Sequence, residues 1–295
     1  PPLQQARRGL TSAAMAKTAL LSSRAVVKVG GADARAFLNG LLTADAPEPG
    51  KARFGALLTP QGKILFDMVM AAREGEVFLD CRAEAAEALV KRLTLYRLRA
   101  KATIERLPDW AVGVAVGGDF DADERDVLCF HDPRWLGLGQ RLIGPRPAVE
   151  RALRKGEPAR EADYEALRIG LGAPEFGSDF GADEVFLLDV NYDALQGVDY
   201  KKGCFIGQEV TSRMKRKGEA RRRVLRVSFE GAPPAKGAPV TAGASQLGAI
   251  MSGAEGVALA LIRLDRLTAA QQAEAAIMAD GQPLRIDIPA YLEDG

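Results

Sequence analysis

Residues 201–209 read Lys-Lys-Gly-Cys-Phe-Ile-Gly-Gln-Glu and place one cysteine, Cys204, between two glycines and behind two lysines. Positive charge stabilises a thiolate, and so do the unpaired N–H groups of a helix N-terminus, where the sequence predicts this stretch to lie. The flanking glycines let another backbone or a ligand approach closely. The stretch therefore predicts a reactive thiol at Cys204.

The other two cysteines lie in apolar runs. Cys81 ends residues 77–81 and Cys129 lies within residues 127–130, so both are predicted to be small buried side chains. Three cysteines without a pairing pattern argue against a disulfide framework and for a reducing compartment. Only Cys204 is therefore expected to carry chemistry.

The composition is typical of a globular protein, with 47% hydrophobic and 27% charged residues in a chain of 295. Its apolar runs are shorter than the roughly 18 residues that a membrane-spanning helix needs, so no membrane partner is expected. The charge is uneven. Residues 201–223, named here the basic ribbon, hold nine Lys/Arg and two Glu, whereas the whole chain has a net charge of +1.

Several common catalytic centres are not supported by the sequence. The one histidine, His131, begins the turn His-Asp-Pro-Arg and is predicted to be structural or solvent-facing, which argues against a Ser-His-Asp hydrolase. No Cys-x-x-Cys, His/Cys cluster, G-x-G-x-x-G or P-loop pattern occurs. Asp67 is a further candidate, because it is a carboxylate in the otherwise apolar run 64–69; the alternative is a place on the solvent face of that strand.

The N-terminal residues allow two interpretations. Residues 1–32 contain no acidic residue, which fits an organellar transit peptide and would place the chain in the mitochondrial matrix. Alternatively, Met15 is the natural start, residues 1–17 are a leader or upstream segment, and the protein is bacterial and cytoplasmic. The second interpretation is favoured because residues 25–29 already have the pattern of a first strand.

Periodicity and turn residues predict an α+β fold followed by a small all-β part. A helix is expected over residues 34–42 with Asp33 as N-cap, and a further helix over 84–96. Residues 172–188 are Gly- and acid-rich and are expected to form an irregular surface loop. Strands are expected at 25–29, 54–58, 63–72, 76–81, 100–105, 110–116, 128–130 and 140–143, and, in a C-terminal barrel, at 224–229, 247–251, 256–262 and 284–288.

Residues 202–209 resemble the signature of YgfZ-type folate-binding proteins. This family includes the mitochondrial factor for late iron–sulfur cluster maturation and is related to the glycine-cleavage T-protein, an aminomethyltransferase. Residues 31–40, 60–64, 96–101 and 132–141 resemble further elements of the family. The resemblance implies the three-part, ring-like aminomethyltransferase fold, of α+β class, with a C-terminal β-barrel and a tetrahydrofolate-sized cavity.

The resemblance also implies a division into domains. Residues 22–50 and 157–220 would form the first folate-binding-type domain, which carries the Cys204 motif. Residues 51–156 would form an inserted α+β domain, and residues 221–292 the barrel.

The same resemblance implies the functional residues. The residues implied to be reactive or catalytic are Cys204, Lys202 and Asp67, and Cys204 is also implied to be a ligand of a shared iron–sulfur cluster. Folate contacts fall on Asp67, Lys202, Gly203, Gln208, Glu209 and Arg213. Two positions differ from the T-protein: Gly170 replaces its folate-binding glutamate, and Phe66 replaces one of its paired aspartates. These differences favour cluster assembly over aminomethyl transfer.

Three functional hypotheses follow. The first is an iron–sulfur cluster assembly factor that uses Cys204 as a shared cluster ligand or exchange thiol, with assembly or carrier proteins as partners and a cluster bridged to one of them. The second is a tetrahydrofolate-dependent one-carbon transferase, or a folate-dependent tRNA-modification factor. The third is that the basic ribbon binds nucleic acid. This hypothesis is disfavoured because aromatic residues, which would stack on bases, do not alternate with the charges of the ribbon.

Overall fold

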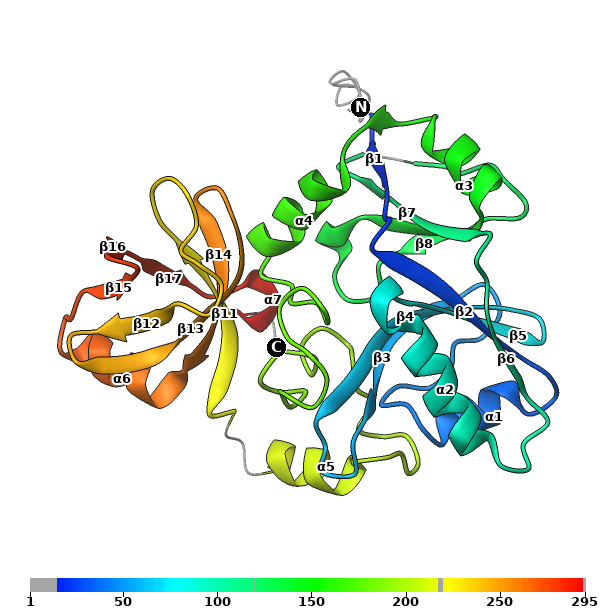
Figure 1. The fold of residues 1–295 in the computed structure, drawn as a ribbon, viewed down its shortest axis with the longest axis horizontal. Coiled ribbons are helices and arrows are strands. Elements are labelled where there is room, and N and C mark those ends of the chain that lie inside the picture. The colour runs from blue at the N-terminus through cyan, green and yellow to red at the C-terminus, as the bar shows by residue number, and fades with distance from the viewer. Residues whose placement is uncertain (1–14, 119, 217–219, 294–295) are drawn as a thin grey trace, which may run out of the picture.

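Two five-stranded sheets and one seven-stranded sheet occur in the residues that the computed structural model describes, 15–118, 120–216 and 220–293 (Figure 1). The first sheet has the order β3-β4-β5-β2-β6. Its strands are β2 (Arg24–Gly30), β3 (Ala52–Leu58), β4 (Ile64–Arg73), β5 (Glu76–Arg82) and β6 (Thr103–Arg106). The strands predicted at residues 54–58, 63–72 and 76–81 are confirmed as β3, β4 and β5, which pair antiparallel in sequence as a meander.

The strand β2 ties the N-terminal part to this meander by pairing antiparallel with both β5 and β6. The first sheet therefore crosses the domain boundary that was expected between residues 50 and 51. Pairing between strands so far apart in the chain leaves no local pattern in the sequence. Helices α1 (Ala34–Asn39) and α2 (Ala86–Arg97) accompany the sheet, and α2 follows the 3₁₀ turn η1 (Ala83–Ala85).

Asp33 occupies the predicted N-cap position of α1 but does not cap it with its side chain. Its carboxylate instead accepts a hydrogen bond of 2.7 Å from the backbone N–H of Lys101. The Asp33 side chain thus joins the start of α1 to the segment before β6. This long-range contact takes the place of the predicted local N-cap.

The second sheet has the order β10-β1-β7-β9-β8. Lys17, which was expected to end a leader segment, instead begins β1 (Lys17–Leu20), and this strand pairs with β7 and β10. The other elements of this part are β7 (Trp110–Val116), β8 (Leu128–His131), η2 (Leu136–Leu138), β9 (Gln140–Pro145), α3 (Arg146–Leu153), β10 (Glu157–Pro158) and α4 (Glu161–Gly170). Residues 1–14, the first part of the acid-free stretch 1–32 on which the transit-peptide expectation rests, lie outside the described residues.

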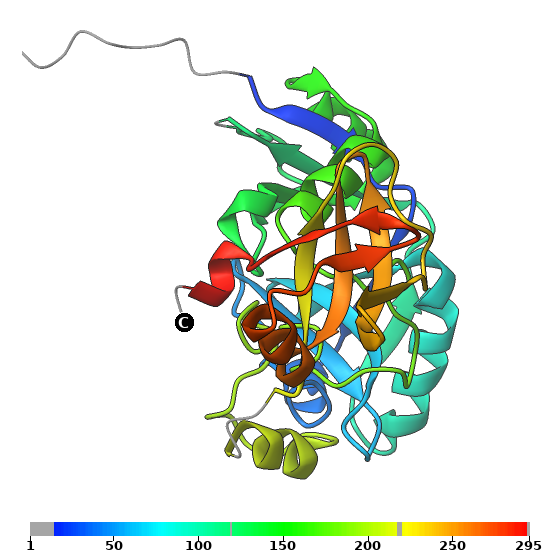
Figure 2. The same ribbon diagram turned by 90° about the vertical axis from the view of Figure 1, so that its left-hand side faces the viewer.

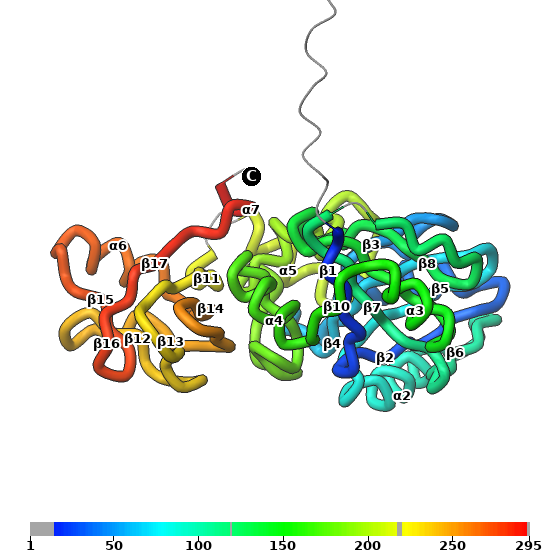
Figure 3. Tube along the Cα trace, turned by 90° about the horizontal axis from the view of Figure 1, so that it is seen from above, coloured from blue at the N-terminus to red at the C-terminus, as the bar shows by residue number. Residues whose placement is uncertain are grey.

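The predicted C-terminal barrel is confirmed as a strongly curved sheet of order β16-β15-β12-β13-β14-β11-β17 (Figure 2). It has a core of its own, which includes Val227, Val240 and Leu247. Its elements are β11 (Arg222–Ser228), β12 (Pro239–Ala242), β13 (Ser245–Ala254), β14 (Val257–Arg263), α6 (Leu264–Gln272), β15 (Ile277–Ala279), β16 (Gln282–Pro283), β17 (Arg285–Asp287) and α7 (Ala290–Glu293). Seen from above, α4 and α5 (Gln208–Arg216) lie between the barrel and the other sheets (Figure 3).

The segment between α4 and α5 is irregular, as predicted, but the expectation of a surface loop at residues 172–188 was wrong. Phe176, Phe180 and Leu187 are buried in the largest hydrophobic core. Carboxylates of the same segment accept hydrogen bonds from its buried backbone N–H groups. For example, Asp179 accepts a hydrogen bond of 2.8 Å from the N–H of Glu175. Acidic residues that indicated exposure in the sequence therefore serve as internal hydrogen-bond acceptors.

Candidate functional site

Cys204 is exposed and lies in an irregular segment just before Gln208, where α5 begins. The other two cysteines differ from it. Cys81 is buried, as predicted, and burial raises its pKa to about 12. Cys129 is half-buried rather than fully buried, and burial raises its pKa as well. Cys204 is thus the one cysteine that the fold presents to solvent.

Lys202 anchors the loop on one side of Cys204. Its side chain is only 2% exposed, and its ammonium donates a hydrogen bond of 2.7 Å to the carbonyl of Leu42 and pairs with Asp45 at 3.3 Å. The ammonium also lies 5.6 Å from the ring centroid of Phe205. Burial lowers the pKa of Lys202, and Asp45 partly opposes that effect. The charge of Lys202, one of the two lysines expected to activate Cys204, is therefore already matched by Asp45.

Gly207 anchors the loop on the other side. Its φ of +79° is in the left-handed region, and a Cβ there would lie 2.8 Å from the carbonyl oxygen of Thr59 and 3.0 Å from the Cα of Gly62. Gly62, in the turn between β3 and β4, in turn faces the side chain of Val210 on α5. The motif thus requires glycine at position 207 to seat α5 on the tip of the β3–β4 hairpin.

Gly203 differs from Gly207, because a Cβ at Gly203 would meet no heavy atom within 4 Å. The glycine next to Cys204 therefore keeps space open toward solvent. Gln208 and Glu209 are the first two residues of α5, where the carboxylate of Glu209 lies at the positive end of the helix dipole. Arg213 is exposed on the same helix.

Several cations of the basic ribbon have partners within the chain, so fewer of them are available to another molecule than the sequence suggests. Arg222 pairs with Asp189 at 2.7 Å, and Arg223 forms a two-pronged pair with Asp193. Lys215 lies over the ring of Tyr200, 3.7 Å from its centroid. Lys217 and Glu219 fall outside the described residues. Within the described part of the basic ribbon, the exposed cations are Lys201, Arg213, Lys215, Arg216 and Arg221.

Asp67 lies in the interior, with 2% of its surface exposed. One carboxylate oxygen accepts hydrogen bonds from the backbone N–H of Phe176, at 3.2 Å, and from the hydroxyl of Tyr192. The other oxygen has no hydrogen-bond partner among the described residues. Burial raises the pKa of Asp67, and the charge of Arg24 opposes this only in part. Its hydrogen-bond partners, Phe176 and Tyr192, differ from Leu42 and Asp45, which hold Lys202 of the Cys204 loop.

Asp67 borders a buried ionic network that the sequence analysis did not find. Arg24 pairs with Asp80 at 2.6 Å and with Glu175 at 3.0 Å. Arg141 is fully buried between Asp80 and Asp132. A single arginine in a sequence is normally read as a surface residue, so no local signal pointed to this network.

Arginines set the charge state of the network's carboxylates. Burial alone would raise the pKa of Glu175, but Arg24, Arg168 and Arg134 outweigh burial and hold that pKa below its usual range. The pKa of Asp132 is lowered in the same way, with Arg134 and Arg141 outweighing burial. The network joins β2, β5, β9, the turn before β9 and the irregular segment, and so links the first two sheets.

A cavity of about 360 Å³ lies beside this network. It is lined by Ala52, Ala194, Gln196 and residues 130–136, which include the aromatic side chains Phe130 and Trp135 and the exposed His131. The ring of Trp135 meets that of Tyr291 edge to face, with centroids 5.9 Å apart. None of the residues predicted to contact folate lines this cavity.

Within the described ranges, no group of three or more His, Cys, Asp or Glu side chains is arranged to hold a metal ion. No helix in the same ranges is long and apolar enough to cross a membrane.

Comparison with known proteins gives findings of three kinds: a family model, relatives of similar sequence and a solved structure. The family described as "CAF17, C-terminal beta-barrel domain" matches residues 221–294. The "Iron-sulfur cluster assembly factor IBA57, mitochondrial" of Mus musculus is 32% identical over 280 residues, which cover 84% of this chain and 77% of that protein. The human protein of the same name is 32% identical over 278 residues, with 84% and 77% covered.

The third kind of finding is a solved structure. The glycine cleavage system aminomethyltransferase T from Bartonella henselae matches with a TM-score of 0.73 at 18% identity, and the match covers 95% of this chain and 87% of that one. A likeness at this identity shows the fold alone. The expected aminomethyltransferase fold with a C-terminal β-barrel is thereby confirmed.

Proposed function

The chain belongs to the IBA57 family of iron–sulfur cluster assembly factors, and on that premise we propose that Cys204 donates one thiolate ligand to a cluster shared with a partner protein. The cluster is the cargo of the reaction, and the partner is an iron–sulfur assembly or carrier protein. On binding, the Cys204 thiol loses its proton to solvent and its sulfur bonds to iron.

The observation that carries this proposal is the presentation of one thiol on a doubly anchored loop. Lys202 fixes the loop to the carbonyl of Leu42, and Gly207 seats it on the β3–β4 hairpin. Cys204 lies exposed between the two anchors, with open space at Gly203. A loop that is fixed at both ends and offers one free thiolate suits a metal cluster whose other ligands come from a second protein.

Ligand counting supports the shared arrangement. Iron–sulfur clusters take four protein ligands in most sites. The part of the chain that the structure describes offers no group of three or more metal-binding side chains. A cluster at Cys204 would therefore draw its remaining ligands from the partner, and it would form or transfer only when the two proteins meet.

The test is complementation with Cys204→Ser in cells that lack the endogenous factor, with the activity of iron–sulfur enzymes as readout. Cys129→Ser is the matched control, because Cys129 is half-buried and lies on β8, away from the loop. Loss of maturation with Cys204→Ser but not with Cys129→Ser supports the proposal. Full activity of the Cys204→Ser variant would contradict the proposal.

Folate binding is the second candidate, and the cavity beside residues 130–136 is the observation that favours it. Its volume of about 360 Å³ and its aromatic walls suit a flat heterocycle. Phe130 and Trp135 would hold the ring, and Gln196 offers hydrogen bonds. A bound tetrahydrofolate would supply a carrier for one-carbon units.

Asp67 lies outside the lining of this cavity, and one of its oxygens is already occupied by Phe176 and Tyr192. Folate binding at the cavity therefore predicts that Trp135→Ala abolishes tetrahydrofolate binding in calorimetry, whereas Asp67→Asn retains it. Equal binding by Trp135→Ala and the unmodified chain would exclude this cavity. Aminomethyl transfer and a role in tRNA modification stay predictions from the resemblance.

A further inference from the structure

The C-terminal half of α2 has an apolar surface that no part of the described chain covers. Leu95 is 67% exposed and Leu98 is 88% exposed, whereas Ala86, Leu89 and Leu93 of the same helix face the core. Together with Val90 and Thr94, the two leucines line a groove of about 550 Å³. We call the groove and its rim the α2 patch.

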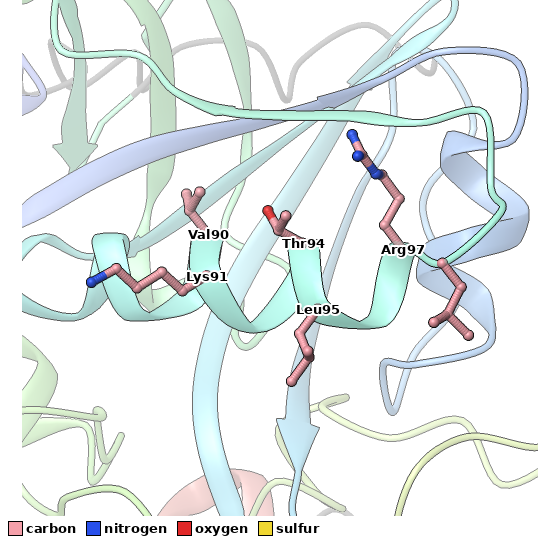
Figure 4. A pocket seen from close by; sticks show the side chains of 6 residues that line it. Val90, Lys91, Thr94, Leu95 and Arg97 are labelled. Atoms are coloured by element: carbon pink, nitrogen blue, oxygen red, sulfur yellow. The ribbon is translucent and has the colours of Figure 1, made fainter.

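The groove runs between two neighbouring rows of side chains on one helix. Val90, Thr94 and Arg97 follow each other at intervals of four and three residues along one side of α2, and Leu95 projects from the other side (Figure 4). Rows of this spacing form the ridges and grooves by which helices pack on each other. A helix of another protein can pack its own ridges against such rows.

The rim of the patch is basic. Its exposed cations are Lys91, Arg92, Arg97, Arg99 and Lys101. None of their charged side-chain groups forms an ion pair with a carboxylate of the described residues, although Glu87, one turn nearer the start of the helix, pairs with Arg106. The helix dipole accounts for a cation in the last turn, such as Arg97, but not for Arg99 and Lys101 beyond the helix. Charge complementarity therefore calls for an acidic partner.

Leu98 provides an independent observation. Its φ of +44° and ψ of −106° fall in a region that favours glycine, and the N–H of Ala100 bonds to the carbonyl of Arg97 across it. A leucine held in this conformation costs roughly 1–3 kcal/mol, and its side chain buries almost nothing within the chain. Glycine would serve the turn better, so the fold alone does not explain a leucine here.

We propose that the α2 patch docks an acidic amphipathic helix of a partner protein. The apolar ridge of that helix would lie in the groove against Leu95 and Leu98, and its Glu and Asp side chains would pair with the basic rim. This surface lies on α2, a different element from the loop that carries Cys204, so the proposal does not depend on the cluster ligand.

The test uses the full chain and a fluorescent synthetic helix of Glu, Ala and Leu with its leucines on one face. We expect salt-dependent binding that weakens about tenfold or more in Leu95→Ser/Leu98→Ser, as for an interface anchor, and in Lys91→Glu/Arg97→Glu. Ile288→Ser and Lys51→Glu are matched controls, because both residues are exposed and lie elsewhere. A peptide with Lys in place of Glu should not bind.

Leu98→Gly separates docking from folding. It should leave the unfolding temperature unchanged or raise it, because glycine suits the turn, and yet weaken binding of the peptide. The proposal is overturned if the acidic peptide does not bind, if the leucine variants bind it as well as the unmodified chain, or if the patch binds anionic phosphatidylglycerol vesicles instead.

Discussion

Gly207 lies against Thr59 so closely that a methyl group on the glycine would come within 2.8 Å of the threonine carbonyl oxygen. This contact seats the start of α5 on the β3–β4 hairpin and fixes the end of the loop that carries Cys204. The motif that predicted a reactive thiol is thus also a packing device. Its two glycines have different tasks, because Gly203 has open space where Gly207 has none.

Gly207→Ala should therefore separate folding of the loop from its chemistry. Alanine at φ +79° is strained by roughly 1–3 kcal/mol, and its Cβ would meet backbone atoms that cannot move aside cheaply. We expect a lower unfolding temperature and loss of cluster maturation, although Cys204 is intact. Calorimetry and complementation measure the two effects.

Gly203→Ala is the matched control for that experiment. It should keep the unfolding temperature of the unmodified chain, because its Cβ meets nothing within 4 Å. Equal stability of the Gly207→Ala variant would show that the contact with Thr59 does not hold the loop.

Glu175→Gln should destabilise the protein by about 3–5 kcal/mol at neutral pH, since it leaves buried arginines without their counter-charge. Because the folded-state pKa of Glu175 is depressed, its contribution is present above the ordinary pKa of 4.5 and is lost as pH falls below it. The stability difference from the unmodified chain should shrink in acid. Urea unfolding at neutral and acidic pH measures it, and a difference independent of pH would contradict the assignment.

Asp67→Asn should show the opposite dependence on pH. Burial raises the folded-state pKa of Asp67, so its charged form costs stability at neutral pH, and this cost disappears as pH falls through that pKa. The asparagine oxygen can still accept from Phe176 and Tyr192. We expect a smaller loss at neutral pH than for Glu175→Gln, and we expect the unmodified chain to gain stability relative to this variant as pH falls toward 3.8. The same urea series tests it; a larger loss than for Glu175→Gln would refute it.

Tyr291→Phe should loosen the C-terminal helix α7. The hydroxyl of Tyr291 donates to the carbonyl of Gly172 at 2.6 Å and accepts from the amide of Asn191 at 2.9 Å. Losing both buried bonds should cost about 1–3 kcal/mol, visible as faster amide exchange in residues 285–293. Tyr96→Phe is the control, because Tyr96 makes no side-chain hydrogen bond within the described ranges. Unchanged exchange would show that the ring contact with Trp135 alone holds α7.

Local patterns predicted the strands of the first sheet, three strands of the second, α2 and four strands of the barrel, because alternation and turn residues report on nearby backbone. They also identified Cys204 as the cysteine in an open setting. They did not reveal β1, whose pairing with β7 is long-range, or the burial of Phe176 and Arg141. Arg141 becomes a core residue only through partners such as Asp80, which lies 61 positions away in the chain. The roles of Lys202 and Asp67 likewise depended on contacts that no spacing encodes.

The central claim is that Cys204 completes a cluster together with a partner. The direct measurement is visible and Mössbauer spectroscopy of the purified chain mixed with a cluster-loaded iron–sulfur carrier protein, for the unmodified chain, Cys204→Ser and Cys129→Ser. We predict a new cluster spectrum in the mixture, retained with Cys129→Ser and lost with Cys204→Ser. The same spectrum with Cys204→Ser would contradict the claim.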